Sequence, residues 1–159
     1  MANRGQSRHE PAFRNGPFTS STPLPPPVAE GTLRIIPLGG LEEVGRNMTV
    51  LEYENDIMII DMGLQFPEEN MPGIDYIIPN ISYLLPLRKN IRGVIITHAH
   101  YDHIGGIPHL MPRLGKDIPL FGTDITLAII NKRQDDYQEI SGALKTHEVK
   151  NNTRVKLGV

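Results

Sequence analysis

The chain contains the sequence His98-Ala99-His100-Tyr101-Asp102-His103, here called the histidine loop. Three imidazoles and one carboxylate within so short a stretch are ligands that suit zinc and its first-row neighbours. The preceding Gly93-Val94-Ile95-Ile96-Thr97 is a short apolar run rich in β-branched residues, the pattern of a strand buried on both faces. We therefore expect the histidine loop at the end of a strand, a common position for an active site in α/β proteins.

The residues after the histidine loop predict a helix. The segment 104–111 carries Gly105, Gly106 and Pro108 in its first half, where a helix tolerates glycine and proline best, and Asp102 is a candidate N-cap. The direction of the Tyr101 side chain cannot be read from the sequence.

The spacing divides the histidine loop into two pairs of ligands. His98 and His100 can project toward one metal ion, and Asp102 and His103 toward a second. Two cations about 3.5–4 Å apart can activate water and clamp the oxygens of a phosphoryl or acyl substrate. A catalytic zinc has about three protein ligands, so at least two further ligands are expected outside the loop.

The pattern HxHxDH formed by His98, His100, Asp102 and His103 resembles the signature of the metallo-β-lactamase fold. Residues 38–48 and 59–67 are in addition similar to the opening of bacterial ribonuclease J, a β-CASP nuclease family, and the likeness runs from about residue 33 to residue 159. The resemblance implies an α/β fold, an αββα sandwich, of which this chain holds the amino-terminal half.

The resemblance also implies a set of roles. Two zinc ions, with manganese as the alternative, would be held by His98 and His100 at the first position and by Asp102 and His103 at the second. Asp102 and His103 would be the catalytic residues, and Asp61 would brace the ligand loop without binding metal. The expected activity is hydrolysis of RNA phosphodiester bonds, 5′–3′ exonucleolytic, endonucleolytic or both, by a full-length enzyme that forms a homo-oligomer. The family's remaining ligands and its inserted RNA-binding domain come from later sequence, so these residues alone are expected to be inactive.

Two other functions share the same histidine loop. A hydrolase of this fold could act on a thioester or a lactam, since fold does not determine substrate. The chain could also be a metal-binding module without activity. The similarity of residues 39–48 and 61–67 to ribonuclease J favours RNA as the substrate.

The composition bounds the partners and the compartment. A net charge of −2 and a pI near 6.3 give no global basic field for nucleic acid. The chain has no cysteine, and its sequence shows neither an apolar run of the roughly 20 residues that a membrane span needs nor a signal-type apolar core. We expect a cytoplasmic protein with no membrane partner.

The chain divides into a tail and one structured region. Residues 1–31 hold six of the 14 prolines and show no apolar periodicity, which predicts a disordered tail. Residues 32–159 are then the amino-terminal part of a metallo-β-lactamase domain, truncated inside a strand-like pattern. The patterns predict strands at 33–37, 48–53, 57–61, 93–97, 118–121, 143–149 and 154–159, helices at 80–87, 104–111 and 124–138, a turn at 54–56, a turn at Asn151-Asn152, and Thr123 as a cap.

Other candidate residues receive structural interpretations. His147 lies in a polar strand segment and is expected at the surface, and His109 is expected to pack on the helix or face solvent. Gly39, Gly40 and Gly45 lack the spacing of a nucleotide-binding loop and are expected to allow a close backbone approach near the site.

Overall fold

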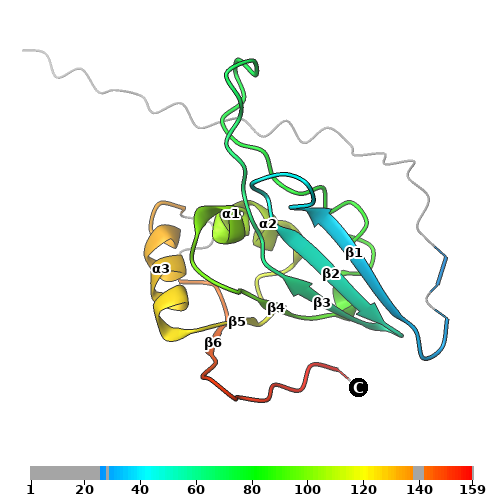
Figure 1. Cartoon of the computed structure of the whole chain (residues 1–159). Helices are drawn as coiled ribbons and strands as arrows, with labels where there is room; N and C mark the ends of the chain where they lie inside the picture. The colour runs from blue at the N-terminus through cyan, green and yellow to red at the C-terminus, as the bar shows by residue number, and fades with distance from the viewer. Residues whose placement is uncertain (1–25, 28, 138–141, 159) are drawn as a thin grey trace, which may run out of the picture.

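The computed structural model describes residues 26–27, 29–137 and 142–158, and within them the chain forms one mixed six-stranded sheet with its strands in chain order (Figure 1). Its elements are β1 (Leu33–Gly39), β2 (Met48–Tyr53), β3 (Asp56–Ile60), the 3₁₀ turn η1 (Arg88–Asn90), β4 (Ile91–Ile95), α1 (Tyr101–Ile104), α2 (Ile107–Leu114), β5 (Leu120–Gly122), α3 (Asp124–Gln134) and β6 (Thr146–Glu148). None of the helices in the described ranges is long and apolar enough to cross a membrane.

The first three strands are antiparallel. Tyr53 pairs with Asp56, so Glu54 and Asn55 make the turn between β2 and β3. Glu54 adopts a left-handed conformation with φ of 53°, which a tight hairpin turn requires. The predicted hairpin is confirmed.

The last four strands are parallel, and their order brings the functional segments together. β3 pairs with β4 through Ile60 and Ile95, and β4 pairs in parallel with β5. Because the carboxyl ends of parallel strands meet at one edge of the sheet, Asp61 after β3 lies beside the start of the histidine loop after β4. The predicted position of this loop, at the end of a buried strand, is confirmed.

The core covers one face of the sheet. Val50, Ile59 and Val94 are fully buried and pack in one cluster with side chains of the three helices, including Leu110. Burying each such side chain contributes about 1.5–3 kcal/mol. The opposite face of β1 is open, since Ile35 keeps 61% of its surface exposed. A sheet with one covered face and exposed apolar side chains on the other face of its edge strand β1 agrees with half of an αββα sandwich.

Two predicted helices differ in the structure. Residues 80–87 form turns and lead into η1, because the Asn80 side chain accepts a hydrogen bond from the Ser82 amide at 3.0 Å and Pro86 cannot donate a helical one. The helix expected at 104–111 is divided into α1 and α2 at Gly105-Gly106. The prediction of Asp102 as N-cap was wrong, since His100 occupies that position and Asp102 lies in the first turn of α1.

The last part of the described chain also departs from expectation. Residues 154–158 form no strand, because no strand of the described sheet pairs with them. The turn at Asn151-Asn152 is confirmed, with Asn152 at φ of 64°. Thr123 is the N-cap residue of α3, although its hydroxyl donates to Thr126 and makes no capping bond. The tail at 1–25 and the predicted end of the third helix at Gln138 lie outside the described residues.

Candidate metal centre

Asp61 anchors the end of β4 to the end of β3. The residue is 5% exposed, and its backbone takes a left-handed conformation with φ of 62°, which aspartate tolerates better than most residues. The Thr97 amide donates to Asp61 Oδ1 at 2.8 Å, and the Thr97 hydroxyl to Oδ2 at 2.9 Å. The carboxylate is therefore held in one orientation, against the residue that immediately precedes the histidine loop.

The second function of this carboxylate is to orient His103. Asp61 Oδ2 lies 2.7 Å from His103 Nδ1. An ionised carboxylate can only accept a hydrogen bond, so Nδ1 carries the proton and Nε2 keeps its lone pair. A carboxylate that fixes the tautomer of a histidine in this way is typical of the residues that support metal ligands.

His103 Nε2 points toward the side chain of Asp102. The two atoms His103 Nε2 and Asp102 Oδ2 are 3.4 Å apart. Asn47 fixes this carboxylate from outside the loop, because its Nδ2 donates to Asp102 Oδ2 at 3.0 Å and its backbone amide donates to the Asp102 carbonyl at 3.0 Å. Asp102 and His103 thus present one oxygen and one nitrogen as a pair.

His98 and His100 form a second pair. His98 Nε2 lies 3.1 Å from His100 Nδ1, and the two rings meet edge to face with centroids 4.6 Å apart. The Thr97 hydroxyl lies 3.0 Å from His98 Nδ1, so each ring nitrogen of His98 has a polar neighbour. The ring of His98 is also close to that of His103, with centroids 4.1 Å apart, so the two pairs adjoin.

These pairs fit metal ions in part. Adjacent ligand atoms of a tetrahedral zinc site are about 3.4 Å apart when the bonds are 2.0–2.1 Å. The separations of 3.1 Å and 3.4 Å match that spacing. Across the described ranges, however, no three His, Asp or Glu side chains converge as one metal-holding group. The histidine loop therefore holds its donor atoms in two adjoining pairs, and within the described residues neither pair forms a complete metal site.

Close backbone contacts set the position of the loop. A Cβ on Gly63 would lie 1.7 Å from the Asp102 carbonyl oxygen, so only glycine fits there. The neighbouring residues 39–47, here called the glycine loop, also make the close backbone approach expected from their glycines. A Cβ on Gly39 would meet the Arg46 carbonyl at 2.3 Å. Glu43 holds this loop closed: both its oxygens accept from the Arg46 guanidinium at 2.8 Å, which lowers the pKa of Glu43 and raises that of Arg46.

The other two histidines among the described residues lie apart from this centre. His147 is exposed on β6 and stacks on Phe121, with ring centroids 5.1 Å apart. His109 packs on α2 between Tyr76 and Tyr137, at centroid distances of 4.2 Å and 5.4 Å. Burial lowers the pKa of His109.

Asn47 and Thr97 had no role in the sequence interpretation, although both contact the candidate ligands. Asn47 stands at the end of the glycine loop, and Thr97 directly precedes His98. A polar residue at the end of a buried apolar run was the only available signal for Thr97. Nothing local indicated Asn47, because its partner Asp102 is 55 residues away.

Residues 71–159 match the beta-lactamase superfamily domain. The chain belongs to the beta-lactamase superfamily. The metallo-β-lactamase fold inferred from the HxHxDH pattern is therefore confirmed.

Within the superfamily, relatives of this chain include ribonucleases. The chain is 40% identical over 129 residues to ribonuclease J of Thermus thermophilus, covering 79% of this chain and 22% of the relative. It is 43% identical over 109 residues to ribonuclease J of Mycolicibacterium smegmatis, covering 69% and 19%, and 36% identical over 143 residues to that of Corynebacterium glutamicum, covering 90% and 20%. The resemblance to ribonuclease J is confirmed, and the chain spans about a fifth of the length of these relatives.

A solved structure shares the fold. A protein of unknown function from Enterococcus faecalis V583 superposes with a TM-score of 0.58 at 19% identity, covering 79% of this chain and 35% of that one.

Proposed function

We propose that this chain is the amino-terminal, metal-binding part of a cytoplasmic ribonuclease J that hydrolyses RNA phosphodiester bonds. The observation that carries the proposal is the histidine loop, whose two donor pairs adjoin in a chain 36–43% identical to ribonucleases J. The same matches favour RNA over a thioester or lactam substrate. RNA would be bound by the full-length enzyme, including parts outside residues 1–159. We expect that enzyme to be a homo-oligomer that cleaves RNA from its 5′ end, at internal sites or both.

The residues divide the work. His98 and His100 would hold one zinc or manganese ion, and Asp102 and His103 the other. When bound, the ions would make water a nucleophile near neutral pH and offset charge on the phosphate. Asp102, oriented by Asn47, would direct the attacking water in line with the leaving oxygen. Asp61 keeps the proton of His103 on Nδ1, which leaves Nε2 available as a ligand.

Residues 1–159 alone should be inactive, because each donor pair lacks a third ligand. Within the described part of the chain no other side chain supplies one.

The test is single-turnover cleavage of 5′-monophosphorylated RNA by the full-length enzyme. Asp102→Ala and His100→Ala should each nearly abolish cleavage, since each removes one donor of a pair. His147→Ala is the matched control, because this histidine is exposed and lies outside the centre.

Circular dichroism verifies that each variant folds. Cleavage by Asp102→Ala at the wild-type rate would overturn the assignment, and a severe loss in His147→Ala would show that a ligand has been misplaced. Robust cleavage by residues 1–159 would refute the incomplete sites.

A further inference from the structure

We propose that Phe66 and Tyr101 form a stacking platform for one unpaired base of single-stranded RNA, beside the histidine loop. The proposal rests on the proposed function and adds to it a place where the substrate is held. It is carried by ring geometry, exposure and position.

The two rings are parallel and one of them is open to solvent. Their centroids are 5.4 Å apart and their planes differ by 9°. Phe66 nevertheless keeps 66% of its surface exposed. Because one side of the Phe66 ring rests on Tyr101, the exposed area includes the face that is turned away from it. That face can accept a further flat ring.

The platform is fixed before any ligand binds. Gln65, the residue before Phe66, exchanges two backbone hydrogen bonds of 2.9 Å with Ile77. Between these residues the chain projects from the body of the molecule as a long loop (Figure 1). Phe66 thus stands at the anchored base of the loop, and a side chain held in place loses less entropy on binding.

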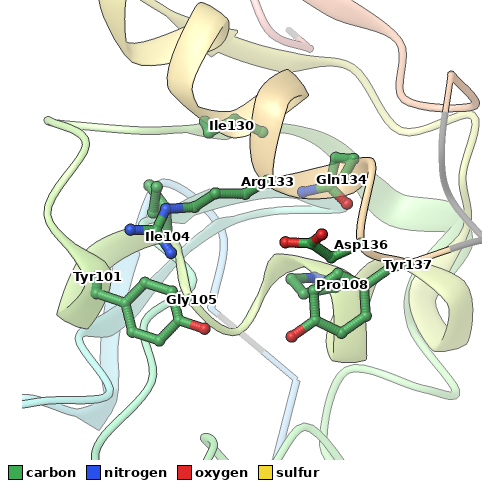
Figure 2. Close-up of a pocket in the computed structure, with 9 residues that line it drawn as sticks. All are labelled: Tyr101, Ile104, Gly105, Pro108, Ile130, Arg133, Gln134, Asp136 and Tyr137. Carbon is green, nitrogen blue, oxygen red and sulfur yellow. The ribbon is translucent and has the colours of Figure 1, made fainter.

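Tyr101 also contacts a cation. Arg133 reaches over the Tyr101 ring from α3, with its guanidinium carbon 4.4 Å from the ring centroid (Figure 2). The cavity beside them, lined also by Tyr137 and Asp136, measures about 50 Å³. That space suits a few water molecules. A base would accordingly stack on the open face of Phe66, and Arg133 would add positive potential for the phosphate backbone.

Position links the platform to the chemistry. Tyr101 lies between His100 and Asp102, so its backbone is part of the candidate metal centre. A base on Phe66 would belong to a nucleotide close to the phosphate being cut. Stacking on aromatic side chains holds single strands of any sequence, whereas bases in a duplex are already stacked on their neighbours.

The test measures RNA binding by the full-length protein with a chelator present, so that no cleavage intervenes. The probes are single-stranded RNAs with 2-aminopurine at successive positions, whose fluorescence falls when the base stacks. Phe66→Ala should weaken binding about 5- to 100-fold and remove the quenching at one position. Phe66→Trp should retain both, and a matched RNA duplex should not distinguish the variants.

Val44→Ala is the control, because Val44 is an exposed apolar residue, at 87%, without a ring. Its affinity should equal that of the wild type. If Phe66→Ala keeps the wild-type RNA affinity and quenching, the platform is refuted. If Phe66→Ala keeps its RNA affinity but no longer forms oligomers on sedimentation, Phe66 belongs to a protein interface and the platform is also refuted. RNA binding that depends on Phe66 in a protein that does not cleave RNA would support the platform and refute the nuclease function. RNA cleavage by a protein whose binding does not depend on Phe66 would support the nuclease function and refute the platform.

Discussion

At the residue scale, the candidate centre depends on a carboxylate, that of Asp61, which fixes the tautomer of His103. Asp61 is buried, binds Thr97 and His103, and holds the ring proton of His103 on Nδ1. The Asp61 supporting role is a proposal that the sequence suggested through family resemblance, and the 2.7 Å contact supplies its physical basis. The role of Asn47 could not be predicted, because it depends on a contact between distant segments.

Asp61→Asn tests this role. The amide can offer N–H to His103 Nδ1, which would shift the ring proton to Nε2 and weaken metal binding. RNA cleavage by the full-length enzyme should fall roughly 10- to 100-fold with the fold intact. Asp75→Asn, in an exposed loop, should leave the rate unchanged. An unaltered rate in Asp61→Asn would show that the Asp61–His103 contact does not matter.

His109 gives a prediction for pH. Its Nε2 is buried and has no hydrogen-bond partner among the described residues, and burial lowers its pKa. The unfolded chain therefore binds a proton more readily than the folded one, and stability should fall as the pH drops below the ordinary histidine pKa of about 6.5. His109→Phe, which can keep the stacking on Tyr76, should lose less stability than the wild type between pH 7.5 and pH 5.5 in urea unfolding. Equal losses in both proteins would contradict this assignment.

At the element scale, the centre is a junction between the ends of β3 and β4. The strands and the loop at their ends could be predicted because short β-branched runs mark buried strands. The helices were less predictable: Ile81 and Leu84 are buried with helical spacing, yet the Asn80 turn and Pro86 prevent a helix. The break between α1 and α2 likewise depends on tertiary contact, because a Cβ on Gly106 would lie 2.5 Å from the Gly63 carbonyl.

Gly63→Ala tests the junction. The added methyl would clash with the Asp102 backbone, so the variant should unfold at a lower temperature and lose metal affinity. Gly73→Ala is the control: no atom lies within 4 Å of its Cβ position, and its φ of 80° leaves only the conformational cost of about 1–2 kcal/mol. If Gly63→Ala is as stable as Gly73→Ala, the backbone at the junction can shift to accommodate the methyl group, and the close contact with Asp102 is not required.

At the scale of the whole molecule, the six-stranded sheet positions both donor pairs, but within the described residues neither pair has a third ligand. Periodicity predicted individual strands and helices, whereas the resemblance carried by the HxHxDH pattern predicted the α/β fold, and the domain match over residues 71–159 confirms the superfamily. The strand expected at 154–159 did not form in the described residues, because alternation specifies a strand only when a neighbour pairs with it. The open face of the sheet and the two unfinished donor pairs both agree with a chain that spans about a fifth of its relatives.

Metal content tests the central claim most directly. Elemental analysis of the full-length protein after dialysis should find about two zinc or manganese ions per chain, because each donor pair of the histidine loop then has its remaining ligands. His147→Ala should retain both ions, and Asp102→Ala should hold fewer. A full-length wild-type protein that retains one ion or none would contradict the two-metal account.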